Sequence, residues 1–110
     1  MAQETYPKDP DGVAAYTIDW TDFLAELGSA VTISTSVWVS ADSALVVEDD
    51  SVSADSKKTT VVLSGGSAVL GTIHEVTNTI VPSNDATQSE PRTLLIRMGV
   101  NKGGEWVFWE

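Results

Sequence analysis

The stretch YTIDWTDFLAELGSAVTI, residues 16–33, decides the fold of this chain. It opens with Tyr16–Trp20, whose alternation of apolar and polar residues is typical of a strand. Residues 21–27 follow with the signals of a short helix, in which Thr21 or Asp22 is the expected N-cap. The stretch therefore predicts a strand that leads into a helical turn.

Gly28 is a stop signal for that helix, and a long alternating strand begins at Val31. A helix this short is not stable in isolation, so tertiary packing has to hold it. Phe23, Leu24 and Leu27 form its apolar face, and we expect them to plug one end of a sheet structure. The whole stretch thus joins two strands through one packed helical turn.

The rest of the chain is typical of short strands separated by turns. Turn-forming residues recur about every ten residues between alternating segments. The expected strands are Val13–Asp19, Val31–Val39, Ala44–Glu48, Val52–Ala54, Thr59–Leu63, Thr72–Val81 and Arg92–Val100. This pattern predicts an all-β protein, an Ig-like β-sandwich of about seven short strands with one helical turn near residues 21–27.

The chain is long enough for one domain with its own hydrophobic core. Residues 1–12 are polar and contain Pro7 and Pro10, which predicts an extended N-terminal arm, either disordered or laid against a neighbour. Residues 13–100 form the expected sandwich. Residues 101–110 form an aromatic C-terminal tail with a Gly-Gly hinge.

The second long strand poses a problem of side-chain direction. Ile33 and Trp38 have opposite parity, so strict alternation would expose one of them. A β-bulge near Ser34–Ser36 would put both side chains on the same face, and we favour this interpretation. The expected core consists of Ile18, Trp20, Phe23, Leu27, Ile33, Trp38, Val61, Leu63, Val76, Ile80, Leu94, Ile96 and Met98.

Charge and composition narrow the class of partner. With 16 acidic and 6 basic residues the net charge is -10, which disfavours nucleic acid and anionic membranes as partners. Basic or neutral protein surfaces fit better, and solubility alone is the simpler explanation of the acidity. There is no cysteine, no signal-peptide pattern at the start and no apolar run of membrane-spanning length.

No motif in the sequence predicts catalysis or a cofactor. His74 is the only histidine and has no cysteine or nucleophile motif to work with, so we expect a packed core residue. Ser64–Ser67 lacks the lysine of a phosphate-binding loop and predicts a hairpin turn. The acidic residues of the middle segment match no calcium-binding loop and predict a solvated rim rather than a metal site: Asp42, Glu48, Asp49, Asp50 and Asp55.

Several segments, in order and spacing, are similar to one protein family. They are Lys8–Asp11, Tyr16–Trp20, Ile33 with Ser36 and Trp38, Val61–Gly66, Gly71–Ile80 and Arg92–Met98. Over Lys8–Val100 the chain resembles the small Ig-like tail-associated virion proteins of tailed bacteriophages, of the fibre–tail adaptor or neck–tail accessory type. Two features depart from that pattern: His74 replaces the usual Tyr, and Glu105–Glu110 has no counterpart.

This resemblance implies a non-enzymatic structural adaptor of the virion that joins tail, neck or fibre components through protein–protein contacts. Several copies per particle and assembly in the host cytoplasm are further expectations. A carbohydrate-binding Ig-like module and a capsid decoration protein remain alternatives. The candidate partner-binding residues lie at the two chain ends and are Tyr6, Pro7, Pro10, Trp106, Val107, Phe108 and Trp109.

The sequence leaves two interpretations of the C-terminal aromatic residues open. In a strand, Trp106 and Phe108 would share one face while Val107 and Trp109 would share the other. This last strand could pair back onto its own sheet. It could equally anchor the chain on another subunit, because Trp and Phe are favoured at interface hot spots.

Overall fold

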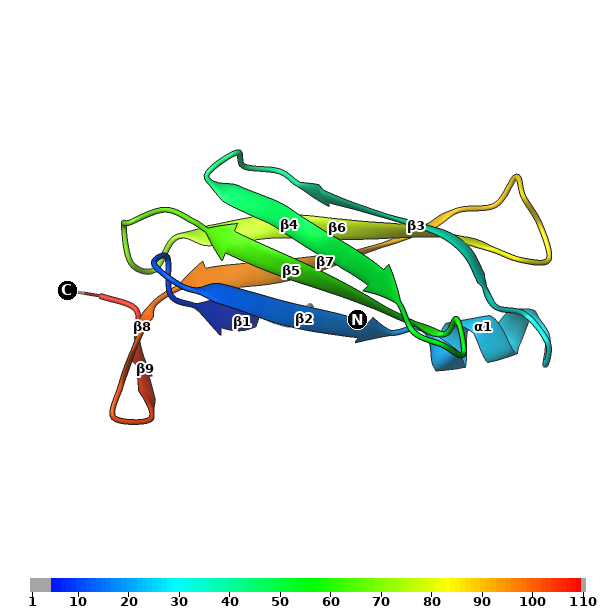
Figure 1. Ribbon diagram of the computed structural model, residues 1–110, viewed down its shortest axis with the longest axis horizontal. Coiled ribbons are helices and arrows are strands. Elements are labelled where there is room, and N and C mark those ends of the chain that lie inside the picture. The colour runs from blue at the N-terminus through cyan, green and yellow to red at the C-terminus, as the bar shows by residue number, and fades with distance from the viewer. Residues whose placement is uncertain (1–4, 110) are drawn as a thin grey trace.

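Two β-sheets face each other along the length of the molecule, which measures 48 × 25 × 25 Å (Figure 1). The computed structural model describes residues 5–109. Its elements in chain order are β1 Thr5–Lys8, β2 Val13–Asp19, α1 Thr21–Leu27, β3 Ile33–Ser40, β4 Leu45–Val52, β5 Lys58–Gly65, β6 Ile73–Pro82, β7 Glu90–Met98, β8 Val100–Lys102 and β9 Glu105–Val107.

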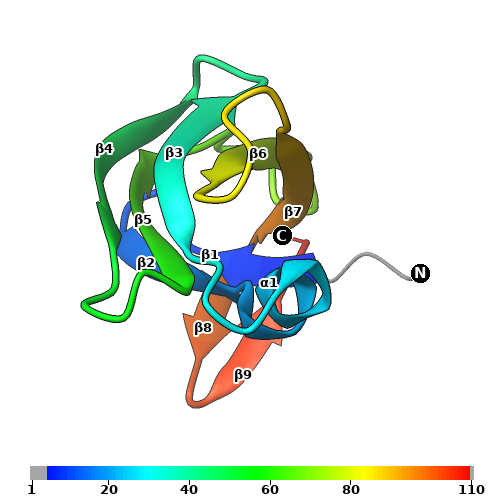
Figure 2. The same cartoon turned by 90° about the vertical axis from the view of Figure 1, so that its right-hand side faces the viewer.

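One sheet has four strands in the order β1-β7-β6-β3, and the other has three in the order β2-β5-β4 (Figure 2). Strands β8 and β9 form a separate hairpin. The second, fourth and fifth strands thus share one sheet and the third, sixth and seventh the other, as B, D, E and C, F, G do in immunoglobulin-type sandwiches. The expected all-β sandwich with one short helix is confirmed.

Helix α1 closes one end of the sandwich (Figure 1). The expected cap at Thr21 or Asp22 is wrong, because the N-cap position is Trp20 and no side chain caps the helix there. Instead the Asp19 carboxylate accepts a hydrogen bond from the Thr21 backbone N–H at 2.9 Å. Leu24 is the fully buried residue of the helix, so packing of this side chain anchors it to the core.

Strand β3 contains the β-bulge that the positions of its apolar residues predict. Its register against β6 shifts between Ile33 and Thr35, and both Ile33 and Trp38 are buried. Phe23 and Leu27 are half-buried and pack against the core. The buried apolar residues of the described chain are Ile18, Trp20, Leu24, Val31, Ile33, Trp38, Leu45, Val61, Leu63, Val76, Ile80, Leu94, Ile96 and Met98.

Two expected local features differ in the structure. The segment Val52–Ala54 is not a separate strand, because β4 continues to Val52 and a register shift between Val47 and Asp49 keeps it paired with β5. The Ser64–Ser67 turn does not make a hairpin, since it leads from β5 in one sheet to β6 in the other. Both errors concern pairing partners, which local turn signals do not specify.

A buried polar cluster ties the two sheets together, and we call Trp20, Ser36, Thr59 and Asn78 the Trp20 cluster. The Trp20 indole N–H lies 3.1 Å from both Thr59 Oγ1 and Asn78 Oδ1. The Thr59 hydroxyl donates to Asn78 Oδ1 at 2.7 Å, and the Asn78 amide donates to Ser36 Oγ at 2.8 Å. Because its polar atoms have partners inside the core, the cluster fixes the spacing of the sheets without leaving a buried group unsatisfied.

Candidate functional site

The N-terminal candidates belong to the sandwich itself. Of the expected arm, Thr5–Lys8 forms β1, which runs parallel to β7 at the edge of the four-stranded sheet, while residues 1–4 lie outside the described part. The Tyr6 ring packs against Tyr16, with 5.8 Å between ring centroids, and the Tyr16 hydroxyl donates to the Pro7 carbonyl at 2.8 Å. Burial raises the pKa of Tyr16 to about 12. The described part of the arm is therefore laid against its own chain.

Lys8 is a structural residue that sequence reasoning missed. Its side chain is buried, and its ammonium donates to the carbonyls of Asp9 at 2.9 Å, Gly12 at 2.6 Å and Gly65 at 2.7 Å. Burial lowers the pKa of Lys8, while the nearby Asp9 and Asp11 charges act in the opposite direction. Three acceptors satisfy all three donors, so Lys8 clamps the turn after β1 to the end of β5.

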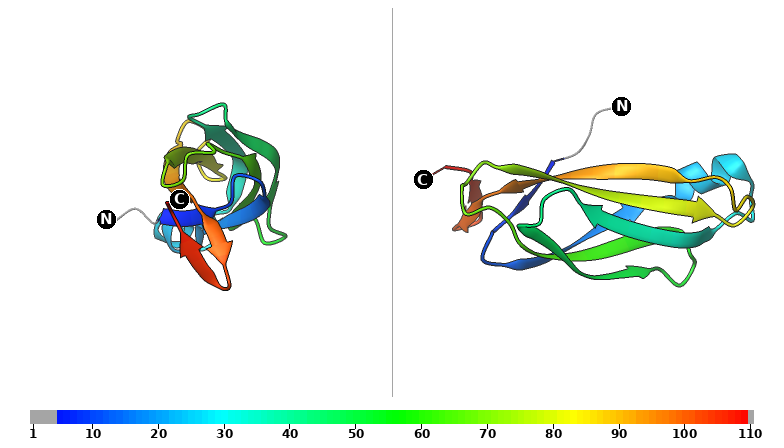
Figure 3. Two further views of the ribbon diagram at one scale, coloured as in Figure 1. Left: turned by 90° about the vertical axis from the view of Figure 1, so that its left-hand side faces the viewer. Right: turned by 90° about the horizontal axis from the view of Figure 1, so that it is seen from above.

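The expected Gly-Gly hinge of the tail is the turn of a hairpin. Gly103 and Gly104 both have positive φ, at 64° and 95°, as a two-residue hairpin turn requires. Strand β9 then pairs with β8 in the hairpin at the C-terminal end of the ribbon (Figure 3). In this pairing Trp106 lies opposite Asn101. The interpretation that the last strand pairs back onto its own sheet holds only in part. The tail does pair with its own chain, but β8 and β9 form a separate two-stranded sheet.

Phe108 docks on the end of the sandwich. The Arg97 guanidinium lies over the Phe108 ring, 4.2 Å from its centroid. Gly99 leaves room for the ring, because a Cβ there would come within 2.8 Å of two of its atoms. A Cβ on Gly71 would likewise lie 2.9 Å from the Phe108 carbonyl oxygen. Two glycines and one arginine thus form the seat of this aromatic residue.

Trp109 stands out from that seat. It is 68% exposed, whereas Trp106, Val107 and Phe108 are half-buried, as are Tyr6, Pro7 and Pro10. The end of β1 also meets the residue before β8, because the Gly99 backbone N–H donates to the Lys8 carbonyl at 2.9 Å. The structure therefore brings β1 and Phe108 to the same strand, β7, and no local sequence pattern predicts this.

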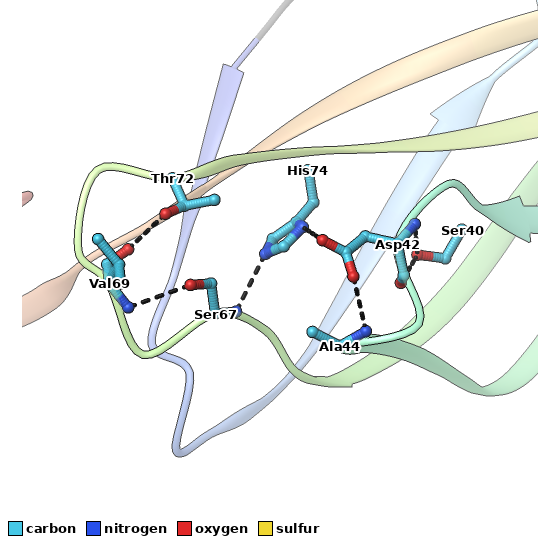
Figure 4. Close-up of polar contacts among 7 residues, drawn as sticks. All are labelled: Ser40, Asp42, Ala44, Ser67, Val69, Thr72 and His74. Atoms are coloured by element: carbon cyan, nitrogen blue, oxygen red, sulfur yellow. Dashed lines mark hydrogen bonds and ion pairs between the residues drawn. The ribbon is translucent and has the colours of Figure 1, made fainter.

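His74 has two partners and no nucleophile (Figure 4). Its Nδ1 lies 3.2 Å from Asp42 Oδ2, and its Nε2 accepts a hydrogen bond from the Ser67 backbone N–H at 3.0 Å. The Ser67 hydroxyl does not face the imidazole but accepts from the Val69 N–H at 3.1 Å. The buried imidazole therefore joins the β3–β4 turn to the β5–β6 loop, and this geometry does not activate a serine.

The other acidic candidates do not converge. Glu48 accepts from the Ser64 hydroxyl at 2.6 Å, Asp49 accepts from the backbone N–H of Asp50 at 2.9 Å, and Asp55 accepts from the Lys57 N–H at 3.2 Å. Across residues 5–109 no group of three or more His, Asp or Glu could hold a metal ion. In the same range no helix is long and apolar enough to cross a membrane.

Fold and site together describe a small β-sandwich scaffold with a docked terminal hairpin. The family model described as "Podophage GP4 fiber-tail adaptor protein gp77" matches residues 8–97, from the end of β1 into β7. The chain therefore belongs to this family of phage fibre–tail adaptors, whose role in the phage particle is structural. No curated protein and no solved structure matches the chain. The hairpin after residue 97 lies outside the family match.

Proposed function

We propose that this adaptor joins tail, neck or fibre components of the virion through its C-terminal hairpin. The observation that carries the proposal is the contrast between Phe108 and Trp109. Phe108 is seated on the chain's own surface, and the next residue holds its indole 68% exposed. A large exposed aromatic side chain is a favoured interface anchor, and the seat of Phe108 lowers the entropy lost in ordering this segment when a partner covers Trp109.

The edge of the four-stranded sheet extends the same surface. Tyr6 and Pro7 lie on β1, which pairs with β7 at this edge, and Lys8 at the end of β1 bonds with Gly99 just before the hairpin. Pro10 follows in the turn that Lys8 clamps. We include Tyr6, Pro7 and Pro10 in the proposed contact surface, because one side chain is too small an area for a specific interface.

Charge and copy number complete the proposal. A net charge of -10 steers the adaptor toward basic partner surfaces and sets the orientation of encounter. Several copies per particle, assembled in the host cytoplasm, would convert weak single contacts into firm attachment. The role is one of position and contact, so it includes no catalytic step, nucleic acid or membrane. Family membership favours this function over a carbohydrate-binding module or a capsid decoration protein.

The decisive experiment measures incorporation of variants into phage particles. We expect Trp109→Ala, and deletion of residues 105–110, to abolish incorporation while the purified proteins stay folded, because β9 pairs only with β8 in the described chain. Val13→Ala is the matched control, since Val13 is also 68% exposed but lies on β2.

The outcome is read from the protein content of purified particles. Normal incorporation of the deletion variant would disprove the hairpin as the attachment site. Equal loss for Val13→Ala and Trp109→Ala would show that attachment depends on the whole surface and not on the hairpin. Circular dichroism of each purified variant separates loss of binding from loss of fold.

A further inference from the structure

Strand β3 contains the palindrome SVWVS, from Ser36 to Ser40, with Trp38 at its centre. The strand forms one edge of the four-stranded sheet, and its only ladder partner in the described chain is β6 (Figure 2). Trp38 is buried in the core, while Val37 and Val39 are 55% and 59% exposed on the outer face. A self-complementary sequence therefore stands at an unpaired sheet edge.

The backbone of β3 is oriented for pairing at this edge. The Ala41 N–H donates to the Glu75 carbonyl of β6 at 2.9 Å, so the backbone groups of the odd-numbered residues in this ladder point toward β6. Backbone groups alternate in direction along a strand, so those of Ser36, Trp38 and Ser40 point away from β6. The palindrome thus presents its central and terminal backbone groups to the free edge.

The edge also lacks the protection that the other edges have. Charged residues and proline commonly block edge strands against pairing. Strand β4 has three consecutive acids, Glu48 to Asp50, β1 contains Pro7 and β2 ends in Asp19. Strand β3 has no charged residue at all, and the only interruption is the register shift near Ile33, before the palindrome.

Charge distribution decides which partner fits. The strands of the four-stranded sheet contain Lys8, Arg92 and Arg97 against Glu75 and Glu90, a net charge of +1 in a chain of net charge -10. Two copies of so acidic a chain repel each other at most surfaces. The strands of this sheet therefore bring no excess of carboxylates to an approaching second copy.

We propose that two copies of the chain associate through β3, antiparallel and about a two-fold axis at Trp38. In this register the Trp38 backbones exchange hydrogen bonds, Ser36 of one copy pairs with Ser40 of the other, and Val37 lies opposite Val39. The two four-stranded sheets become one continuous sheet across the axis. Four valines then form a cluster of β-branched cross-strand pairs on its outer face.

The palindrome favours a second copy over an unrelated strand. An isologous interface needs a segment that complements itself, so that residue i meets j and j meets i. In the SVWVS segment each serine meets a serine, each valine meets a valine and the central tryptophan meets its own copy. A peptide of another protein would also satisfy the backbone, but it would not require the strand to read the same in both directions.

Charge pairs at the two valines test the register directly. Sedimentation equilibrium of the full chain should show a reversible dimer. Val37→Lys with Val39→Lys places lysine opposite lysine twice, and we expect the dimer dissociation constant to rise more than about tenfold. Val37→Lys with Val39→Glu places lysine opposite glutamate twice, so this variant should dimerise like the unmodified chain.

The matched control adds the same charge elsewhere. Val13→Lys with Val46→Lys changes two exposed valines outside the four-stranded sheet and should leave dimerisation intact. Raising the salt concentration should strengthen the dimer of the unmodified chain, because screening weakens repulsion between the acidic copies.

Three results would overturn the proposal. They are a chain that stays monomeric at millimolar concentration, a dimer that survives both lysines at positions 37 and 39, and a Lys/Glu variant that dissociates as the Lys/Lys variant does. A strand peptide that binds the edge of a monomeric chain would assign the edge to another partner. The test uses purified chain only, so it succeeds or fails independently of the hairpin's role in particle attachment.

Discussion

Two guanidinium–aromatic contacts with the same distance occupy very different surroundings. Arg92 lies over the ring of Trp20, and Arg97 over the ring of Phe108, each 4.2 Å from the ring centroid. Trp20 has no exposed surface, and its N–H has partners in the buried cluster. Phe108 is half-buried at the end of the chain, and the residue after it is the exposed Trp109.

The difference shows that burial and connectivity, and not the contact itself, decide what an aromatic residue does. The Trp20 cluster connects the junction of β2 and α1 with β3, β5 and β6, so its loss would weaken the contact between the two sheets. The seat of Phe108 holds only β9 and the terminal residues, so its loss would free a short segment. The same interaction serves stability at one end of the molecule and the presentation of a side chain at the other.

Asn78→Ala tests the buried side of this comparison and should have the largest effect. Asn78 is fully buried and accepts from Trp20 and Thr59 while its amide donates to Ser36. The change leaves buried polar groups without partners and creates a small cavity, which should lower the free energy of unfolding by about 3 kcal/mol. Urea denaturation measures it.

Thr77→Ala is the control on the same strand. Thr77 is half-buried, and its hydroxyl bonds with that of Thr93 at 2.9 Å. We expect a loss of less than about 1 kcal/mol. Equal losses for the two variants would mean that the Trp20 cluster has no special place in the stability of the fold.

Tyr16→Phe tests an intermediate degree of burial. At neutral pH the loss of the hydrogen bond to the Pro7 carbonyl should cost about 1 kcal/mol of unfolding free energy. The folded pKa of Tyr16 is raised to about 12, above its ordinary value of 10.0, so the folded state binds the extra proton between these values. The unmodified chain should therefore lose stability as the pH rises from 10 to 12.

The variant lacks this contribution, so the stability difference between the two proteins should narrow over the same interval. Chemical denaturation at several pH values measures both curves, and the other titrating groups cancel in the difference. A gap that stays constant up to pH 12 would contradict the assignment of the raised pKa to Tyr16.

Gly99→Ala tests the exposed side and should have the smallest effect on global stability. The added Cβ would meet the Phe108 ring at 2.7 Å, so the ring has to leave its seat. The free energy of unfolding should fall by less than about 1 kcal/mol, because few core contacts are lost. Limited proteolysis should nevertheless cut the C-terminal segment much faster.

Gly12→Ala is the matched glycine control. Its Cβ would lie 3.6 Å or more from its nearest neighbours, which is ordinary van der Waals contact. This variant should keep the proteolysis rate of the unmodified chain. If Gly99→Ala unfolded the whole domain, the hairpin would be part of the cooperative core and the contrast with the Trp20 cluster would disappear.

Local patterns in the sequence were sufficient for β2, α1 and the bulge in β3. The bounds of β2 follow from alternation, and the short helix at residues 21–27 follows from its apolar spacing and the glycine after it. Ile33 and Trp38 are an odd number of residues apart, so in a regular strand their side chains would point to opposite faces. Both can be buried on one face only if a bulge lies between them, and this is why the sequence predicts the bulge. These features depend on neighbouring residues only, and so a single sequence specifies them.

The placement of β1 and of the C-terminal residues depends on contacts between distant parts of the chain. Proline and polar residues in the first segment indicate extended backbone, but its place on β7 depends on residues about ninety positions away in the chain. The seat of Phe108 likewise requires Arg97, Gly99 and Gly71 to converge, and no local signal encodes that convergence.

The sequence by itself determined an all-β sandwich with one helical plug, an acidic surface and a family resemblance to phage fibre–tail adaptors. The tertiary structure alone decided which strands are edges, and thereby that β3 has a ladder partner on one side only in the described chain and that Lys8 and Gly99 meet beside β7. The physical reason is the sequence separation over which each kind of interaction acts. Alternation, capping and turn formation act over a few residues, whereas edges and contacts between chain ends arise only when distant strands compete for the same hydrogen bonds and the same core.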